Sequence, residues 1–429
     1  MRLLSRNFCT GGLVWLVVAS CSVYDPELID ATTAGVPPRP SAATSSEVDQ
    51  ETLVFALKDV FVEQSAENAA TIGLDLDSMV TTGQEDASCR PREIEGETVG
   101  QSVVDGDKGI DNSLGSTLLP AAGAVLPCLQ DNLALTMGIG AGTILLVVRE
   151  WNGEQDDASV VATLTTSVDG TDEDPALVGF PADDDVALVY KDGNDDRVAP
   201  DPGWAGRDSW FVDPEDFEED ASGTPDIMRP KIVHEQAYVS FGRIVIPLRA
   251  GTGFRLVSGD GSLPSDGSMS VLVNGGFMTG DISEDRSRLD HGLFTGRMTL
   301  ETLASATAQI GICALNATVI ETLFGEYADV PADPELDGLD AECDAFSLGV
   351  TFSGVGGQIA GVAPRARPKV EPCANSEDVP PIDRCCPSEW LAGRPRAETC
   401  DTPAKAFKAA AFDRLPNSIE LPVAAPNFL

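Results

Sequence analysis

Histidine is nearly absent from this chain. Only His234 and His291 occur among 429 residues. Neither stands in the H-E-x-x-H pattern of zinc hydrolases, and no G-x-S-x-G or glycine-rich phosphate-binding pattern occurs. The sequence therefore points to no metallohydrolase, serine hydrolase or nucleotide-dependent enzyme. A hydrolase that uses two carboxylates across a cleft stays open, because acidic residues are abundant.

Positively charged residues are also scarce. The chain has 28 Lys and Arg against 69 Asp and Glu, which gives a formal net charge of −41. Such a charge opposes contact with the phosphates of nucleic acids and favours divalent cations or basic partners. We therefore expect no nucleic-acid partner. The hydrophobic content of 42% is high enough for a packed core, so the acidic residues are expected at the surface of a folded protein.

Long hydrophobic runs are absent beyond the first residues. Residues 133–148 carry no charge, but they contain three glycines and are shorter than the roughly 20 residues that a spanning helix needs. Residues 302–320 are also uncharged, yet their polar side chains fit an amphipathic helix better. We therefore expect no membrane-spanning helix in the body of the protein.

The amino-terminal segment has its own pattern. Arg2 and Arg6 precede an apolar run over residues 11–19, and the sequence V-A-S-C ends at Cys21. This order resembles a bacterial lipoprotein signal peptide with its lipobox. The resemblance implies that residues 1–20 are removed, that Cys21 carries lipid, and that this lipid holds the protein on a membrane of the cell envelope. In such lipoproteins a serine after the lipidated cysteine, here Ser22, is typical of proteins that are transferred to the outer membrane. An ordinary secretory signal or an uncleaved anchor is the alternative.

Composition divides the rest of the chain into three parts. Residues 21–50 are rich in Pro, Ala, Thr and Ser and are predicted to be a flexible tether. Residues 51–363 contain the strand-like patterns and form the predicted domain. Residues 364–429 are a Cys- and Pro-rich extension with few core residues, which we expect disulfides to hold in place.

Eight cysteines remain once Cys9 and Cys21 are set aside. An even number in an oxidising compartment predicts disulfides, although the pairing stays open and a zinc site is the alternative. The candidates are Cys89, Cys128, Cys313, Cys343, Cys373, Cys385, Cys386 and Cys400.

Short apolar or alternating runs separated by Gly, Asp and Asn predict a mainly β protein. A turn at Asn152 and Gly153 between two such runs indicates a hairpin. We expect an antiparallel β-sandwich with one or two short packed helices, within residues 118–135 and 299–324. The predicted strands cover residues 53–57, 60–62, 72–77, 143–150, 160–168, 186–190, 237–247, 254–257, 269–273 and 347–352.

Two acidic blocks have the spacing of calcium-binding loops. Asp105, Asp107 and Asp111 lie in the sequence D-G-D-K-G-I-D-N, and Asp333 and Asp337 lie in a second block. Carboxylates two residues apart on a turning loop can converge on one hard cation, and glycines permit the bend. Calcium is therefore the predicted cofactor. An Asp- and Gly-rich turn without a metal is the alternative.

The most acidic region, residues 183–226, also contains aromatic side chains. Trp204, Trp210 and Phe211 alternate with carboxylates there, and long insertions between strands often carry function. Aromatic faces stack on sugar rings while carboxylates accept hydrogen bonds from hydroxyls. These three residues are therefore the predicted ligand contacts. A solvated and partly mobile acidic loop is the alternative.

The lipobox, the D-G-D-K-G-I-D-N block and the C-D-A-F-S segment at residues 343–347 together resemble uncharacterised bacterial envelope lipoproteins. This resemblance implies no particular activity. We expect a lipid-anchored envelope protein that is stabilised by calcium and binds surface glycan or another envelope protein without catalysis. A carboxylate-dependent hydrolase of envelope polysaccharide and a structural coat component are the alternatives.

Overall fold

The computed structural model describes most of the predicted domain. Cys21, Cys128, Cys313 and the cysteines of the extension lie outside the described residues, as does the predicted signal peptide. The described residues are 35–41, 51–62, 64–83, 87–94, 97–98, 103–120, 130, 133, 137, 142–167, 186–192, 195–201, 204, 206, 208–257, 268–309 and 324–363.

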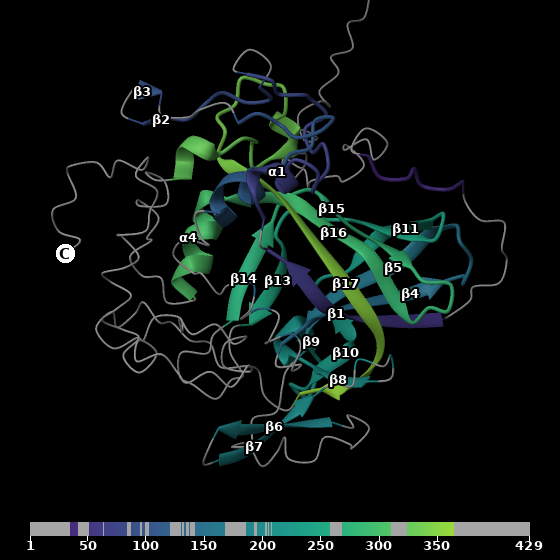
Figure 1. Cartoon of the computed structure of the whole chain (residues 1–429). Helices are drawn as coiled ribbons and strands as arrows, with labels where there is room; N and C mark the ends of the chain where they lie inside the picture. Colours follow the sequence, from purple (N-terminus) through teal and green to yellow (C-terminus); the bar gives the residue numbers. More distant parts are fainter. Residues whose placement is uncertain are drawn as a thin grey trace, which may run out of the picture.

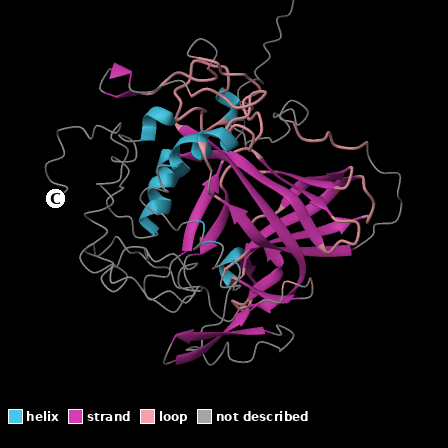
Figure 2. Ribbon diagram, viewed as in Figure 1, coloured by secondary structure: helices cyan, strands magenta, loops and turns pink. Residues whose placement is uncertain are grey.

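Strands dominate the described chain (Figure 2), which confirms the prediction of a mainly β protein. Eight of them form one antiparallel sheet in which each strand pairs with the next along the chain. The last also pairs with the first, through contacts such as Val60 opposite Phe352, so the sheet closes into a barrel. The strands are β1 (Glu51–Phe61), β4 (Ile144–Trp151), β5 (Asp157–Thr166), β11 (His234–Ser240), β12 (Arg243–Pro247), β15 (Phe277–Ile282), β16 (Arg288–Thr299) and β17 (Ala345–Val362).

This barrel replaces the predicted sandwich of two stacked sheets. A sandwich leaves free strand edges, whereas the pairing of β1 with β17 removes them. A ninth strand, β8 (Asp208–Val212), pairs in parallel with the end of β17. Phe55, Leu146, Leu164 and other alternate residues fill the interior with a single apolar core.

The outer wall of the barrel is covered in two places. Val36 and Leu74 pack with Tyr238 of β11, and Tyr238 donates a hydrogen bond from Oη to the carbonyl of Pro37 at 2.7 Å. Residues 35–41 of the predicted tether therefore lie against the barrel. On another side, Trp210 of β8 packs with residues on the outer faces of β1 and β4.

Two long connections leave the same end of the barrel, from the end of β1 and from the end of β16 (Figure 1). The prediction of one or two helices is met in part, since the helix α4 (Leu300–Gln309) covers the first portion of residues 299–324. The other elements are α1 (Ala66–Ala69), β2 (Glu93–Ile94), β3 (Glu97–Thr98), η2 (Leu114–Leu118), β6 (Val186–Asp192), β7 (Asp195–Asp201), η3 (Pro214–Asp216), β9 (Phe217–Glu219), β10 (Pro225–Pro230), β13 (Thr252–Val257), β14 (Ser268–Val273), η4 (Gly325–Tyr327) and η5 (Pro334–Leu336). Among the described residues, no helix has the length and apolar character to cross a membrane.

Candidate metal centre

Three loops meet on the outer wall of the barrel, over the start of β17. One follows α1, the second contains the D-G-D-K-G-I-D-N block, and the third connects η4 to β17. Gly349 of β17 lies so close to the first loop that a Cβ there would be 2.4 Å from the carbonyl oxygen of Ile72. Asn112 joins two of the loops to the barrel, because its amide donates to the Ile72 carbonyl at 2.7 Å and its Oδ1 accepts from the Gly349 N–H at 2.9 Å.

Three carboxylates converge where these loops meet. Asp75, Asp77 and Asp111 each offer an oxygen, and these oxygens lie within 4.8 Å of one another. Local hydrogen bonds hold two of them in place: Asp111 accepts from the Leu76 N–H at 2.6 Å, and Asp77 accepts from the Met79 N–H at 2.9 Å. The Oδ1 atom of Asp75 is buried and has no hydrogen-bond partner among the residues that the structure describes.

A glycine of the second loop lies against one of these carboxylates. Gly109 has φ +84°, and a Cβ at this position would lie 2.8 Å from the Met79 carbonyl and 3.2 Å from Oδ2 of Asp75. Oxygen atoms of the side chain and the backbone therefore surround the glycine. Only glycine adopts this conformation without strain and leaves this space.

The local electrostatics favour neutralisation of the cluster. Burial, followed by the charges of Asp77, Asp329 and Asp105, raises the pKa of Asp111 well above its usual range. Burial is also the main cause that raises the pKa of Asp75 to about 6 and that of Asp105 to about 7.

The charge of Asp105 is among the causes that raise the pKa of Asp111, so the two carboxylates lie near one another. A proton or a cation relieves the repulsion between such like charges.

Asp329 lies beside the carboxylate cluster, on the side of β17. Its Oδ1 accepts from the Ser113 hydroxyl at 2.5 Å and from the Ser347 N–H at 2.8 Å, and its Oδ2 accepts from the Ser347 hydroxyl. Burial raises the pKa of Asp329 to about 6 although these donors oppose the shift. Since its oxygens are already engaged, Asp329 contributes charge to the cluster more than it contributes free ligand atoms.

A buried arginine lies beside the cluster. Arg297 of β16 is 0% exposed, and its guanidinium donates two hydrogen bonds to Asp337 at 2.6 and 2.5 Å. It also donates to the carbonyls of Leu76 and Pro331, at 2.8 and 2.9 Å. The charge of Arg297 is therefore paired with Asp337, which leaves the carboxylates of the neighbouring cluster without an equal number of cations among the described residues.

This geometry fits a hard divalent cation. Calcium binds oxygen ligands at about 2.3–2.6 Å, so ligand oxygens on opposite sides of the ion lie up to about 5 Å apart. The spacing of the oxygens of Asp75, Asp77 and Asp111 is within this limit. Residues of the described chain could therefore hold such an ion without large movement.

The structure separates the predicted metal ligands into two groups. Asp111 is one of the three converging carboxylates, and Asp105 lies close enough to contribute to its raised pKa. Asp337 lies at the side of the cluster, bound to Arg297. Asp107 and Asp333 are exposed, and Asp333 instead accepts a hydrogen bond from the Glu335 N–H at 3.0 Å.

Sequence reasoning missed Asp75, Asp77 and Asp329. The first two lie in the alternating run at residues 72–77, which was interpreted as a strand but forms a loop with a single bridge, between Leu74 and Asp111. The D-x-D spacing of Asp75 and Asp77 within that run is the sequence feature that could have identified them as metal ligands.

The predicted aromatic contacts are not equally accessible. Trp210 is 6% exposed and packs against the barrel wall, so its ring offers no free face. Trp204 and Phe211 are partly exposed. The ring of Trp204 lies 5.4 Å from that of Trp210, and the Lys58 ammonium lies 6.0 Å from its centre.

One predicted disulfide lies within the described residues. Cys89 and Cys343 are bonded and join the loop after Asp77 to the segment before β17. Next to this bond, the Arg90 N–H donates to the Ala341 carbonyl at 2.6 Å and the Cys343 N–H donates to the Arg90 carbonyl at 2.9 Å. The disulfide thus connects two of the three loops that carry the cluster.

The two histidines lie apart from the cluster. His234 is 2% exposed at the start of β11, and burial, with a smaller effect of Arg249, lowers its pKa to about 4. His291 is exposed, and its Nδ1 lies 3.0 Å from Oδ2 of Asp281.

Comparisons with protein-family models, with curated proteins and with solved structures find no match for this chain.

Proposed function

We propose that this protein is a lipid-anchored protein of the cell envelope in which calcium stabilises a non-catalytic binding domain. The observation that carries the proposal is the convergence of Asp75, Asp77 and Asp111 within 4.8 Å, with a buried oxygen of Asp75 that lacks a partner in the described chain. Like charges so close together destabilise a folded protein unless protons or a cation neutralise them.

Calcium at this position links three loops that are distant in sequence. Asp75 and Asp77 come from the first loop and Asp111 from the second, while Arg297 and Asp337 connect them to the third. Bound calcium therefore stabilises the loops at this end of the barrel. This role is structural and needs no catalytic group.

The test is thermal unfolding of the purified chain in EGTA and in excess calcium. A ligand that binds only the folded state stabilises it by about 2–3 kcal/mol at 100 times its Kd. We expect unfolding at a temperature a few degrees higher in calcium, and a smaller increase in magnesium, which requires shorter oxygen distances. Equal unfolding temperatures in EGTA and in calcium contradict the proposal.

The proposed ligand is surface glycan or another envelope protein, contacted through Trp204 and Phe211. Trp210 packs against Trp204 and the barrel wall, so its substitution tests stability rather than binding. We expect the Trp204→Ala, Phe211→Ala double variant to lose retention on insoluble peptidoglycan. Phe241→Ala removes a 76% exposed aromatic ring on the turn between β11 and β12 and serves as the control. Equal retention of both variants contradicts this contact.

The anchor is proposed at Cys21, in the outer membrane. We expect the chain to incorporate labelled palmitate in bacteria and Cys21→Ala to abolish both the label and membrane fractionation. Membrane fractionation of Cys21→Ala at the level of the unchanged protein contradicts a lipid anchor.

A further inference from the structure

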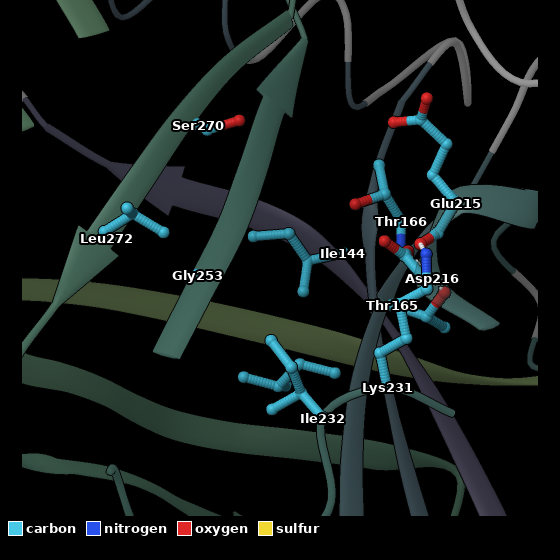
Figure 3. A pocket seen from close by; sticks show the side chains of 11 residues that line it. Ile144, Thr165, Thr166, Glu215, Asp216, Lys231, Ile232, Gly253, Ser270 and Leu272 are labelled. Carbon is cyan, nitrogen blue, oxygen red and sulfur yellow. Dashed lines mark hydrogen bonds between the residues drawn. The ribbon is translucent and has the colours of Figure 1, made fainter. Parts of the chain in front are cut away.

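A pocket of about 180 Å³ opens at the end of the barrel, beside the rim formed by β4 and β5 (Figure 3). Ile144 of β4, Ile232 before β11 and Leu272 of β14 direct apolar side chains toward its centre. Thr165 and Thr166 form one side. Its residues come from the barrel, the paired strands β13 and β14, η3 and the connection before β11, and none belongs to the carboxylate cluster.

A second cavity lies inside the barrel next to this pocket. It has a volume of about 50 Å³ and is lined only by apolar residues, which include Leu57, Met278 and Phe352. Ile144 and Leu164 line both spaces, so these two residues lie between the outer pocket and the inner cavity. The register of β4 and β5, with Leu146 opposite Leu164, places Leu164 on the inner face with the core.

The lining changes from polar at the rim of the outer pocket to apolar in the inner cavity. At the rim, Asp216 accepts hydrogen bonds from the Thr165 hydroxyl at 2.7 Å and the Thr166 N–H at 2.8 Å. The Lys231 ammonium donates to the Glu215 carbonyl at 2.6 Å. Donors and acceptors at the rim thus lie above an apolar interior. This order matches a molecule with a polar head and an apolar chain.

Size and charge restrict the ligand further. An apolar cavity of about 150 Å³ is large enough to take up benzene, so the outer pocket accepts a short chain or a small ring. The net charge of −41 opposes a carboxylate head, and the rim carries Lys231 together with Glu215 and Asp216. An uncharged polar head is repelled neither by the net negative charge of the protein nor by the charged groups at the rim.

We propose that this end of the barrel binds a small amphipathic molecule, namely an alkyl or acyl chain with an uncharged polar head such as a hydroxyl or an ester. The chain passes Ile144 and Leu164 into the barrel, and the head stays at the rim beside Thr165 and Lys231. This site is separate from the calcium cluster, and its ligand differs from the glycan or protein proposed above.

The test is calorimetric titration of the full chain with octanol, in saturating calcium. Leu164→Phe fills the passage and is expected to weaken octanol binding by about tenfold or more. Val161→Phe adds the same kind of ring on the other face of β5, where the side chain is partly exposed, and is expected to leave binding unchanged. Octanoate is expected to bind the unchanged protein more weakly than octanol.

A second variant covers the case in which Leu164→Phe does not fold. Ile232→Trp lies in the connection before β11 and blocks the outer pocket without a change inside the barrel. Weaker octanol binding by either folded variant supports the site. No octanol binding by the unchanged protein, or equal binding by every variant that folds, overturns the proposal. Tighter binding of octanoate than of octanol contradicts the proposal that the ligand has an uncharged head.

Discussion

Arg297 is a buried residue on which the packing of the loops against the barrel depends. It binds Asp337 through both terminal nitrogens and also binds the carbonyls of Leu76 and Pro331. Removal of one partner of a buried ion pair leaves an unpaired charge, which costs about 3–5 kcal/mol. We therefore expect Arg297→Met to lower the free energy of unfolding by about this amount in urea denaturation.

The matched control is the double variant Arg297→Met, Asp337→Asn. It removes both charges, so it is expected to recover part of the stability that the single variant loses. A loss below about 1 kcal/mol in the single variant contradicts a central role for this pair.

The buried His234 is expected to make the folded protein less stable in acid. Burial lowers its pKa from the usual 6.5 to about 4, so the folded protein holds the neutral ring while the unfolded chain becomes protonated near pH 6.5. The stability that this group contributes is fully present above pH 6.5 and is lost as the pH falls toward 4.

We expect the unchanged protein to lose about 3 kcal/mol more than His234→Gln between these two pH values. Urea denaturation of both proteins across this range measures the difference. Parallel pH profiles contradict the neutral buried state.

At the scale of single residues, the sequence predicted part of the carboxylate cluster. The spacing of Asp105 and Asp111 was informative because a glycine-containing loop turns both carboxylates inward. The same spacing gave no sign that Asp107 points to solvent, since that depends on the packing of the loop against Ala70. Asp329 was not predicted at all. Its position follows from hydrogen bonds to Ser113 and Ser347, which are distant in sequence.

At the scale of elements, β17 supports the loops that carry the carboxylate cluster directly. A Cβ at Gly349 would lie 2.4 Å from a backbone carbonyl, so the loop cannot keep its place if the residue is larger. We expect Gly349→Val to weaken calcium binding and to lower the unfolding temperature. Gly354→Ala on the same strand meets its nearest atoms at 3.3 Å and serves as the control with a much smaller expected effect. Equal calcium affinity of both variants contradicts this coupling.

The disulfide between Cys89 and Cys343 is a second connection between elements. It closes a sequence separation of 254 residues and joins two of the loops that form the cluster. Removal of a native disulfide costs about 2–5 kcal/mol. We expect the Cys89→Ser, Cys343→Ser variant to unfold at lower urea concentration and to bind calcium more weakly. Unchanged affinity in a folded variant contradicts the link between the disulfide and the cluster.

Some elements were readable from the sequence and others were not. The hairpin of β4 and β5 was predicted, because two β-prone runs flank a turn at Asn152 and Gly153. Residues 237–247 were interpreted as one strand, but they form β11 and β12 around a tight turn at Phe241 and Gly242, which carry positive φ values. β16 was missed because Asp290, His291 and Gly292 interrupt its apolar pattern.

At the scale of the whole molecule, closure of the barrel is the feature that local patterns could not predict. The same alternation of apolar and polar residues suits a sandwich and a barrel. The difference is the pairing of β1 with β17, which lie at the two ends of the described domain. Gly292 of β16 leaves room beside this closure, because a Cβ there would lie 2.3 Å from the ring of Phe352, which stands opposite Val60 of β1.

The measurement that tests the account most directly is calcium calorimetry on two single variants of the purified chain. Asp77→Asn removes a converging carboxylate, whereas Asp107→Asn removes an exposed one from the adjacent loop with the same change in charge. We expect one calcium ion to bind the unchanged protein and Asp107→Asn with similar affinity, and Asp77→Asn to bind it about tenfold more weakly or not at all. Equal affinities of the two variants, or no heat from the unchanged protein, contradict a metal centre at this cluster.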